Sequence, residues 1–450
     1  MKILLVSANT ATDPYPVYPL GMSMVAAALV AAGHEVSLFD CLQHPQAADA
    51  LTETVRREQP GLVGISLRNI DNVNSLHEER YVGGLKRLVE AVRVASSAKV
   101  LLGGAGFSIM PEAILAACGG DYGIVGEGEV LAVRFVNDAA RGVWPAERIL
   151  RAGTTLVGRA IPSAHYDPSL VAYYQQRGNM CSVQTKRGCQ YRCVYCSYPS
   201  LEGRELRPRD PAAVVDDMVR LVNEHNTKCV FFTDSVFNDD DGHYLNVVRE
   251  IKRRGISIPW TAFFKPGNLG AAEIELMRET GLKGAELGAD AATDTTLRGL
   301  GKSFLWKDVD ETNNLFLDNG VPTALYFMFG GPGETPETVI EGAENIKRLR
   351  KTASFVFMGI RILPDTPLVK IAERDGIIKP GQDLLEPVYY ISPKVDKDWM
   401  EKTLTEQFQG IRHIVFPPDA LNSVIQFLHA QGYSGMLWDL LAADRRPRRK

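Results

Sequence analysis

Short apolar segments alternate with helical patterns twice along this chain, first over residues 1–145 and again after residue 178. The apolar segments of the first series are Ile3–Val6, Val36–Phe39, Leu62–Leu67, Val100–Leu102 and Tyr122–Val125. Fully apolar strands separated by helices indicate a parallel sheet that is covered on both faces. We therefore expect residues 1–145 to form a doubly wound, Rossmann-like α/β domain that binds its ligand at the carboxyl ends of the strands.

The second series predicts six further β/α units. Its apolar segments are Ser182–Lys186, Cys229–Thr233, Ile258–Phe264, Lys283–Leu287, Thr323–Phe329 and Phe355–Ile360. A closed eight-stranded barrel needs about 250 residues, more than this series offers. We expect a partial (β/α)6 barrel over residues 179–380, after a linker at residues 146–178. Residues 381–450 are expected to form a small helical cap with a basic, solvated tail that begins at Arg445.

Composition places the chain among folded proteins with more than one domain. Its 450 residues are 45% hydrophobic and 23% charged, with a net charge of -4. These values argue against a disordered chain and against a nucleic-acid-binding protein. The longest apolar run, residues 19–33, is too short to span a membrane. The N-terminus turns polar after Val6 and has no secretory cleavage site, so we expect a cytoplasmic protein without a transmembrane segment.

Three of the seven cysteines, Cys189, Cys193 and Cys196, fall within eight residues. Such clustering indicates metal chemistry rather than disulfides. Three thiolates on one loop can bind one face of an iron–sulfur cube and leave one iron without a protein ligand. A structural zinc ion would need a fourth ligand, for which Cys181 and His165 are candidates without the usual paired spacing. The scattered cysteines are expected to be small core residues: Cys41, Cys118, Cys181 and Cys229.

The Cys-x3-Cys-x2-Cys motif, with Tyr195 directly before its last cysteine, resembles the radical S-adenosylmethionine (SAM) superfamily. In that family the open iron binds the amino and carboxylate groups of SAM, and an electron of low potential cleaves the sulfonium to a 5′-deoxyadenosyl radical. The resemblance implies a 4Fe-4S cluster on Cys189, Cys193 and Cys196. It also implies an external electron donor, such as a flavodoxin and its reductase.

Later segments resemble the strand signatures of the same family. They are Phe231–Phe237, Glu286–Asp290 with Lys302, Tyr326–Thr335 and Arg361–Leu368. Asp290 stands where the family commonly has glutamate, and Asp365 where glycine is more usual. Thr335 suits the N-cap of a helix as well as it suits a contact with a ligand. The SAM-binding residues implied by the resemblance are Tyr195, Asp234, Ser235, Asp290 and Arg361.

The first domain lacks the Gly-x-Gly-x-x-Gly motif after its first strand, which argues against a nicotinamide dinucleotide. Its segments 19–21, 33–40, 63–66, 102–104 and 126–129 instead resemble, in order and spacing, the cobalamin-binding domain that precedes many radical SAM barrels. The cobalamin contacts implied by this resemblance are Ser66, Arg68, Asn69, Gly103, Gly104, Gly126 and Glu127. An alternative is a sheet kept only as an interaction platform.

Many cobalamin domains donate a histidine from an Asp-x-His-x-x-Gly loop after the first strand. Here that loop, residues 9–19, has no histidine, and His34 lies beyond the following helix. We therefore expect a cobalt whose lower face lacks histidine, with Arg68, Asn69 or the Tyr15–Tyr18 loop beneath it.

The two cofactors together imply methylation of an unactivated carbon of a small-molecule or lipid-like substrate. In the family, one SAM methylates the cobalt and a second generates the radical that prepares the substrate carbon. Rearrangement, cyclisation or ring contraction is an alternative outcome, as is a SAM enzyme whose first domain binds no corrinoid. An iron–sulfur electron carrier would need a fourth cysteine. Aromatic residues that could line the substrate pocket are Trp260, Phe263, Phe264, Tyr326, Phe327 and Phe329.

Overall fold

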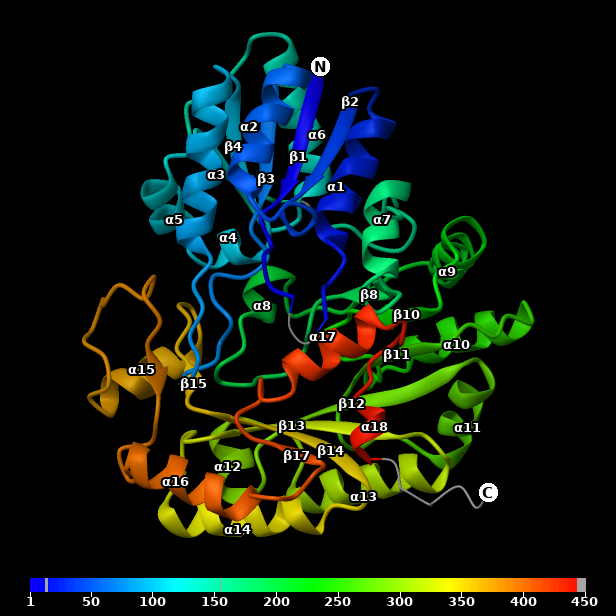
Figure 1. Cartoon of the computed structure of the whole chain (residues 1–450), viewed down its shortest axis with the longest axis vertical. Helices are drawn as coiled ribbons and strands as arrows, with labels where there is room; N and C mark the ends of the chain where they lie inside the picture. Colours follow the sequence, from blue (N-terminus) through cyan, green and yellow to red (C-terminus); the bar gives the residue numbers. More distant parts are fainter. Residues whose placement is uncertain (13–14, 154, 443–450) are drawn as a thin grey trace.

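The computed structural model describes residues 1–12, 15–153 and 155–442. Two parallel sheets, each flanked by helices, stack one above the other along the long axis of the molecule (Figure 1). The N-terminal sheet occupies one end, and helices α8 (Tyr198–Leu201) and α17 (Asn422–Ala430) lie between it and the second sheet. The predicted α/β architecture is confirmed.

The first sheet has the strand order β2-β1-β3-β4-β5-β6, and all its strands are parallel. Its strands are β1 (Lys2–Ser7), β2 (Glu35–Asp40), β3 (Leu62–Ser66), β4 (Lys99–Gly103), β5 (Tyr122–Val125) and β6 (Ile149–Arg151). Its helices are α1 (Leu20–Ala31), α2 (Ala47–Glu58), α3 (Val82–Ala95), α4 (Ala105–Ile109), α5 (Pro111–Cys118) and α6 (Gly128–Ala140). The strand order reverses beside β1, and such a switch point opens a crevice at the carboxyl ends of the strands.

The second sheet forms the partial barrel, with the order β17-β14-β13-β12-β11-β10-β7 and parallel pairing throughout. Its strands are β7 (Met180–Val183), β10 (Cys229–Phe232), β11 (Trp260–Phe264), β12 (Leu282–Asp290), β13 (Thr323–Phe329), β14 (Thr352–Met358) and β17 (Ile414–Val415). The helices between them are α9 (Pro211–His225), α10 (His243–Arg253), α11 (Ala271–Glu279), α12 (Asp294–Gly299), α13 (Trp306–Asp318) and α14 (Pro336–Arg348).

Three details differ from the sequence prediction. The first barrel strand ends at Val183, because Lys186–Arg187 forms a separate strand β8 that pairs antiparallel with β9 (Arg207–Pro208). The two-residue strand β17 adds a seventh member at the sheet edge, and it is too short for hydrophobic periodicity to reveal. The expected linker contains β6, which pairs with β5, and α7 (Pro168–Gln175).

The C-terminal part packs against both units. It contains β15 (Ile360–Arg361), α15 (Pro367–Arg374), β16 (Tyr389–Tyr390), α16 (Lys397–Phe408), α17 and α18 (Asp439–Ala442). Gln426 of α17 donates a hydrogen bond to Thr12 of the first unit at 3.2 Å, whereas α18 lies against β13 and β14. The basic tail that the sequence places after residue 444 lies outside the described residues.

The interior agrees with the sequence in two further respects. All four scattered cysteines are buried. Thr335 caps α14 by accepting a hydrogen bond from the backbone N–H of Thr338 at 3.3 Å, so its structural role is confirmed. In the described part of the chain, we find no helix whose length and hydropathy would let it cross a membrane.

Candidate active site

The three clustered cysteines lie on the loop that follows β8. Gly188 opens this loop at φ +87°, and a Cβ there would lie 2.0 Å from the carbonyl oxygen of Glu205, so only glycine fits. Cys189 is buried, whereas Cys193 and Cys196 are half-buried. Burial, with a smaller contribution from the nearby Cys193 and Cys189, raises the pKa of the Cys196 thiol to about 12. The loop therefore gathers three thiols in a site largely shielded from water.

The spacing of the three sulfur atoms distinguishes between two kinds of metal centre. They do not all lie within 4.8 Å of one another. A tetrahedral zinc ion with Zn–S bonds of about 2.3 Å would hold its sulfurs roughly 3.8 Å apart. Neither Cys181 nor His165 forms a close ligand group with them among the described residues. A separation beyond 4.8 Å argues against a single zinc ion, and three thiols on one loop suit an iron–sulfur cube with one iron left open.

A buried lysine and aspartate lie beside the cysteine loop. Lys302 contacts Asp290 closely and donates to the Tyr195 hydroxyl at 3.1 Å, while Tyr195 donates to Asp290 at 2.5 Å. Burial alone would lower the pKa of Lys302, but Asp290 and Cys193 raise it overall. Asp290 adopts φ +65°, a conformation that aspartate tolerates better than most residues. The cluster of charges thus holds a cation next to Cys193.

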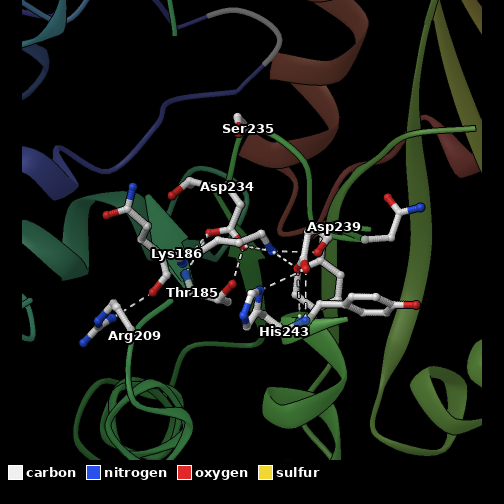
Figure 2. A network of polar contacts seen from close by, with 12 residues as sticks. Thr185, Lys186, Arg209, Asp234, Ser235, Asp239 and His243 are labelled. Carbon is white, nitrogen blue, oxygen red and sulfur yellow. Dashed lines mark hydrogen bonds and ion pairs between the residues drawn. The ribbon is translucent and has the colours of Figure 1, made fainter. Parts of the chain in front are cut away.

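A second buried network fixes the segment that leads into the cysteine loop (Figure 2). The Lys186 ammonium pairs with Asp234 at 3.3 Å and with Asp239 at 3.2 Å. Asp234 also accepts a hydrogen bond from the Thr185 N–H at 2.7 Å and is 1% exposed. Its carboxylate is engaged with protein groups, and its contact with SAM stays a prediction. Ser235 points away from this network and donates to the Gly188 carbonyl at 3.2 Å.

Arg361 also takes a place that the sequence did not suggest. Arg361 is 4% exposed, and its guanidinium pairs with Asp71 of the first unit at 2.7 Å. It donates further to the carbonyls of Ile362 and Leu384. This ion pair ties the two units together, and the contact between Arg361 and SAM stays a prediction. Asp71 and Arg361 are 290 residues apart in the sequence, so no local pattern indicates that they pair.

A cavity of about 970 Å³ lies between the two sheets. Its first-unit wall includes every residue expected to contact cobalamin, namely Ser66, Arg68, Asn69, Gly103, Gly104, Gly126 and Glu127. Its barrel wall includes Met180, Phe231, Phe263, Glu286, Tyr326, Phe355 and Phe357. The cavity therefore runs without interruption from the carboxyl ends of the first sheet into the barrel interior.

Two polar side chains in this cavity fit a large amide-bearing ligand. The Arg68 guanidinium faces the cavity without a hydrogen bond or ion pair to the described residues, and desolvation by the surrounding protein lowers its pKa. Glu129 is 5% exposed, lines the same cavity, and leaves its Oε2 atom without a hydrogen-bond partner. A buried unpaired acceptor is costly unless a ligand donates to it. The first-unit wall therefore fits the cobalamin that the sequence implies.

Glu127 links this wall to the cysteine loop. Its carboxylate pairs with Arg187 at 2.8 Å and closely with Arg207, and Arg187 also contacts Glu129. Desolvation would raise the pKa of Glu127, but the two arginines lower it overall. Because Arg187 directly precedes Gly188 and Cys189, this pairing couples the position of the cavity loop to that of the cysteine loop.

The six candidate aromatic residues fall into two groups, because successive side chains of a strand point to opposite faces of the sheet. Phe263 and Tyr326 line the cavity. The other four, Trp260, Phe264, Phe327 and Phe329, are buried in the hydrophobic core. Sequence reasoning did not single out Glu286 or Trp438 as site residues. Glu286 lay inside a recognised strand signature, but no local signal showed that Trp438 returns to the barrel.

Comparison with known proteins agrees with this geometry. The chain matches the family model "B12 binding domain" over residues 6–136 and the model "Radical SAM superfamily" over residues 183–346. Tryptophan 2-C-methyltransferase of Streptomyces laurentii is 28% identical over 443 residues, which cover 80% of this chain and 73% of that protein.

Two solved structures share the fold. The radical SAM methyltransferase TsrM of Kitasatospora setae, with cobalamin and a [4Fe-4S] cluster bound, superposes with a TM-score of 0.85 at 24% identity. The match covers 98% of this chain and 97% of that one. The cobalamin-dependent SAM radical enzyme OxsB, with aqua-cobalamin and SAM bound, gives a TM-score of 0.71 at 14% identity, covering 91% and 67% of the two chains.

A cobalamin-type sheet joined to a SAM-type barrel, whose first strand leads into a three-cysteine loop, defines an enzyme class. The chain belongs to the cobalamin-dependent radical SAM enzymes, whose cofactors are cobalamin, a 4Fe-4S cluster and SAM.

Proposed function

We propose that the chain transfers a methyl group from SAM, by way of cobalamin, to a carbon atom of a small molecule held in the barrel. The observation that carries this proposal is the single cavity lined by both the first-unit loops and the barrel interior. A group carried on the first wall can reach a substrate on the second without leaving the protein. The activity named for the Streptomyces laurentii relative supports the same reaction type.

When bound, the reduced cluster would supply an electron to SAM, and the corrin would carry the methyl group. Cys189, Cys193 and Cys196 hold the cluster. Tyr195, Ser235 and Asp290 are the proposed SAM contacts, since they border the cysteine loop. We propose that Asp234 and Arg361 position the loop and the interface instead, because both are buried and paired with protein partners, whereas Asp290 is only half-buried.

The first-unit residues hold cobalamin in this proposal. The loop after β4 packs closely against the loop after β3, and only glycine allows this at position 104. A Cβ on Gly104, at φ +94°, would lie 2.5 Å from the Leu67 carbonyl oxygen. Arg68 is proposed to lie beneath the corrin. Since a guanidinium stays protonated and has no acceptor atom, Arg68 would not serve as a ligand to the metal. The free Oε2 of Glu129 would accept a hydrogen bond from an amide of the bound cofactor.

The barrel residues exclude water from the reaction. The apolar wall formed by Met180, Phe231, Phe263, Phe355 and Phe357 favours a substrate with an apolar body. A dry site suppresses side reactions of reactive intermediates. We propose that the electrons come from an external donor such as a flavodoxin and its reductase, and that the protein works in the cytoplasm.

The test uses reduced, reconstituted protein with methyl-labelled SAM and hydroxocobalamin. Label on the corrinoid is the expected result. Formation of 5′-deoxyadenosine without labelled corrinoid would contradict methyl transfer and favour a rearranging or cyclising enzyme. Protein that retains no corrinoid after gel filtration would contradict the cobalamin site itself. The control is Cys193→Ala, which removes a cluster ligand and should abolish SAM cleavage.

A further inference from the structure

One carboxyl group stands inside the barrel, away from the cysteine loop. Glu286 lies at the middle of β12 and is 1% exposed. Tyr326 donates to its Oε2 at 2.8 Å, and the Trp438 indole N–H donates to its Oε1 at 3.2 Å. Tyr15, from the loop after β1, also lies close to this carboxyl. Three distant parts of the chain thus converge on one carboxyl.

The floor beneath Glu286 is closed by the C-terminal segment. A Cβ on Gly284 would lie 2.7 Å from the Trp438 ring and 3.1 Å from Met436, so the glycine makes room for both. Met436, Trp438 and Glu286 all line the cavity. Since alternate residues of a strand point to the same face, Gly284 and Glu286 look into the barrel one above the other. Glu286 therefore marks the deep end of the cavity, which Tyr15 of the first unit also reaches.

The charge around Glu286 is not balanced by the protein. Its hydrogen-bond donors and Tyr15 are neutral, and no Lys, Arg or His among the described residues pairs with it. The titratable groups that face it are Tyr15, Tyr326 and Cys229, and burial raises the pKa of each of these. Arg68 acts on Tyr15 rather than on Glu286. Burial raises the pKa of Glu286 to about 7, although its hydrogen bonds lower it.

A carboxylate offers about four lone-pair sites, and the hydrogen bonds from Tyr326 and Trp438 leave others for a ligand. An ionised carboxylate in an apolar pocket is unfavourable unless a cation or a further donor joins it. We infer that Glu286 anchors the substrate, and that the substrate carries a protonated amine on an apolar, aromatic-sized body. The amine lies at the closed end of the barrel, and the body extends along Phe231, Phe263 and Phe355 toward the first-unit wall. This inference rests on the proposed function, because it assigns the deep end of the cavity to the substrate.

The test compares two soluble probes that differ in charge but share a skeleton: 2-phenylethylamine and 2-phenylethanol. Each is titrated calorimetrically into protein reconstituted with cluster and cobalamin, at pH 6 and pH 8. A hydrogen bond to a charged partner contributes about 1.5–3 kcal/mol, so the amine should bind at least roughly tenfold more tightly at pH 8. The preference should weaken at pH 6, because Glu286 is then mostly protonated, whereas an alkylammonium with a pKa of about 10.4 stays charged.

Glu286→Gln should lose the preference for the amine, whereas Glu341→Gln, a change at an exposed residue of α14, should keep it. Equal affinities in the unchanged protein, no binding of either probe, or a preference that survives in Glu286→Gln would overturn the inference. If Glu286→Gln does not fold, the pH dependence of the unchanged protein decides alone, and a preference that does not grow from pH 6 to pH 8 overturns the inference. Transfer of labelled methyl to the corrinoid is measured in parallel, and its failure tells against the proposed function rather than against Glu286.

Discussion

The buried pairing between the cavity loop and the cysteine loop gives a stability prediction of definite size. Arg187 is 5% exposed and is the charged partner of Glu129, whose Oε2 already lacks a hydrogen bond. Glu127 would keep Arg207 after loss of Arg187, but Glu129 would become a buried charge without a counter-ion. Breaking a buried pair from one side costs about 3–5 kcal/mol. We expect Arg187→Met to lower the free energy of unfolding by that amount.

Urea denaturation followed by far-UV circular dichroism measures this loss. The double variant Arg187→Met, Glu129→Met removes both charges and should lose less than half as much as Arg187→Met, because apolar replacement of a whole buried pair is often close to neutral. Arg253→Met is the matched control: its pair with Glu250 is at the surface, where the arginine side chain is 69% exposed, and should change stability by less than about 1 kcal/mol. A loss from Arg187→Met as small as that of the control would refute the reasoning, as would a double variant less stable than Arg187→Met.

Three further predictions follow from single positions. Cys193→Ala should abolish the visible absorbance of the reconstituted iron–sulfur centre, whereas Cys118→Ala, in the core of the first unit, should keep it. Burial raises the pKa of Glu334 from 4.5 to about 7, so the native state retains a proton that the unfolded chain has lost, and stability should fall as pH rises through this window. Glu334→Gln should flatten that slope in denaturation series from pH 5 to 8, and an unchanged slope would contradict the assignment. Gly123→Ala places a Cβ 2.2 Å from the Phe107 ring and should lower the free energy of unfolding by about 1–3 kcal/mol. The control is Gly21→Ala, whose Cβ meets nothing within 4 Å and should not destabilise the protein. Equal melting temperatures of the two variants would contradict the packing around Gly123.

Local patterns were enough to predict most of the architecture. Apolar strands such as Ile3–Val6 and Thr323–Phe329 alternate with amphipathic helices, and both sheets follow from that alternation. The short strands β6, β8 and β17 were missed or placed within longer segments, because two or three residues carry no period. The cysteine spacing likewise indicated a metal loop before any fold was known.

The polar contacts between distant segments could not be read from the sequence. Arg361 and Asp234 were expected at SAM because they belong to strand signatures, yet their partners are Asp71 and the Thr185–Lys186 segment. Trp438 reaches Glu286 across 152 residues, and nothing in its own neighbourhood indicates that contact. Which buried charge meets which partner depends on the packing of whole units, and spacing along the chain does not contain that information.

The account depends most on where the two metals lie. Anomalous diffraction at the iron and cobalt edges, on crystals of the reconstituted protein, locates both in one experiment. We predict an iron peak beside Cys189, Cys193 and Cys196, and a cobalt peak inside the cavity between Arg68 and the barrel interior that holds Glu286. A cobalt peak outside that cavity, or a single zinc ion at the three cysteines, would contradict the account.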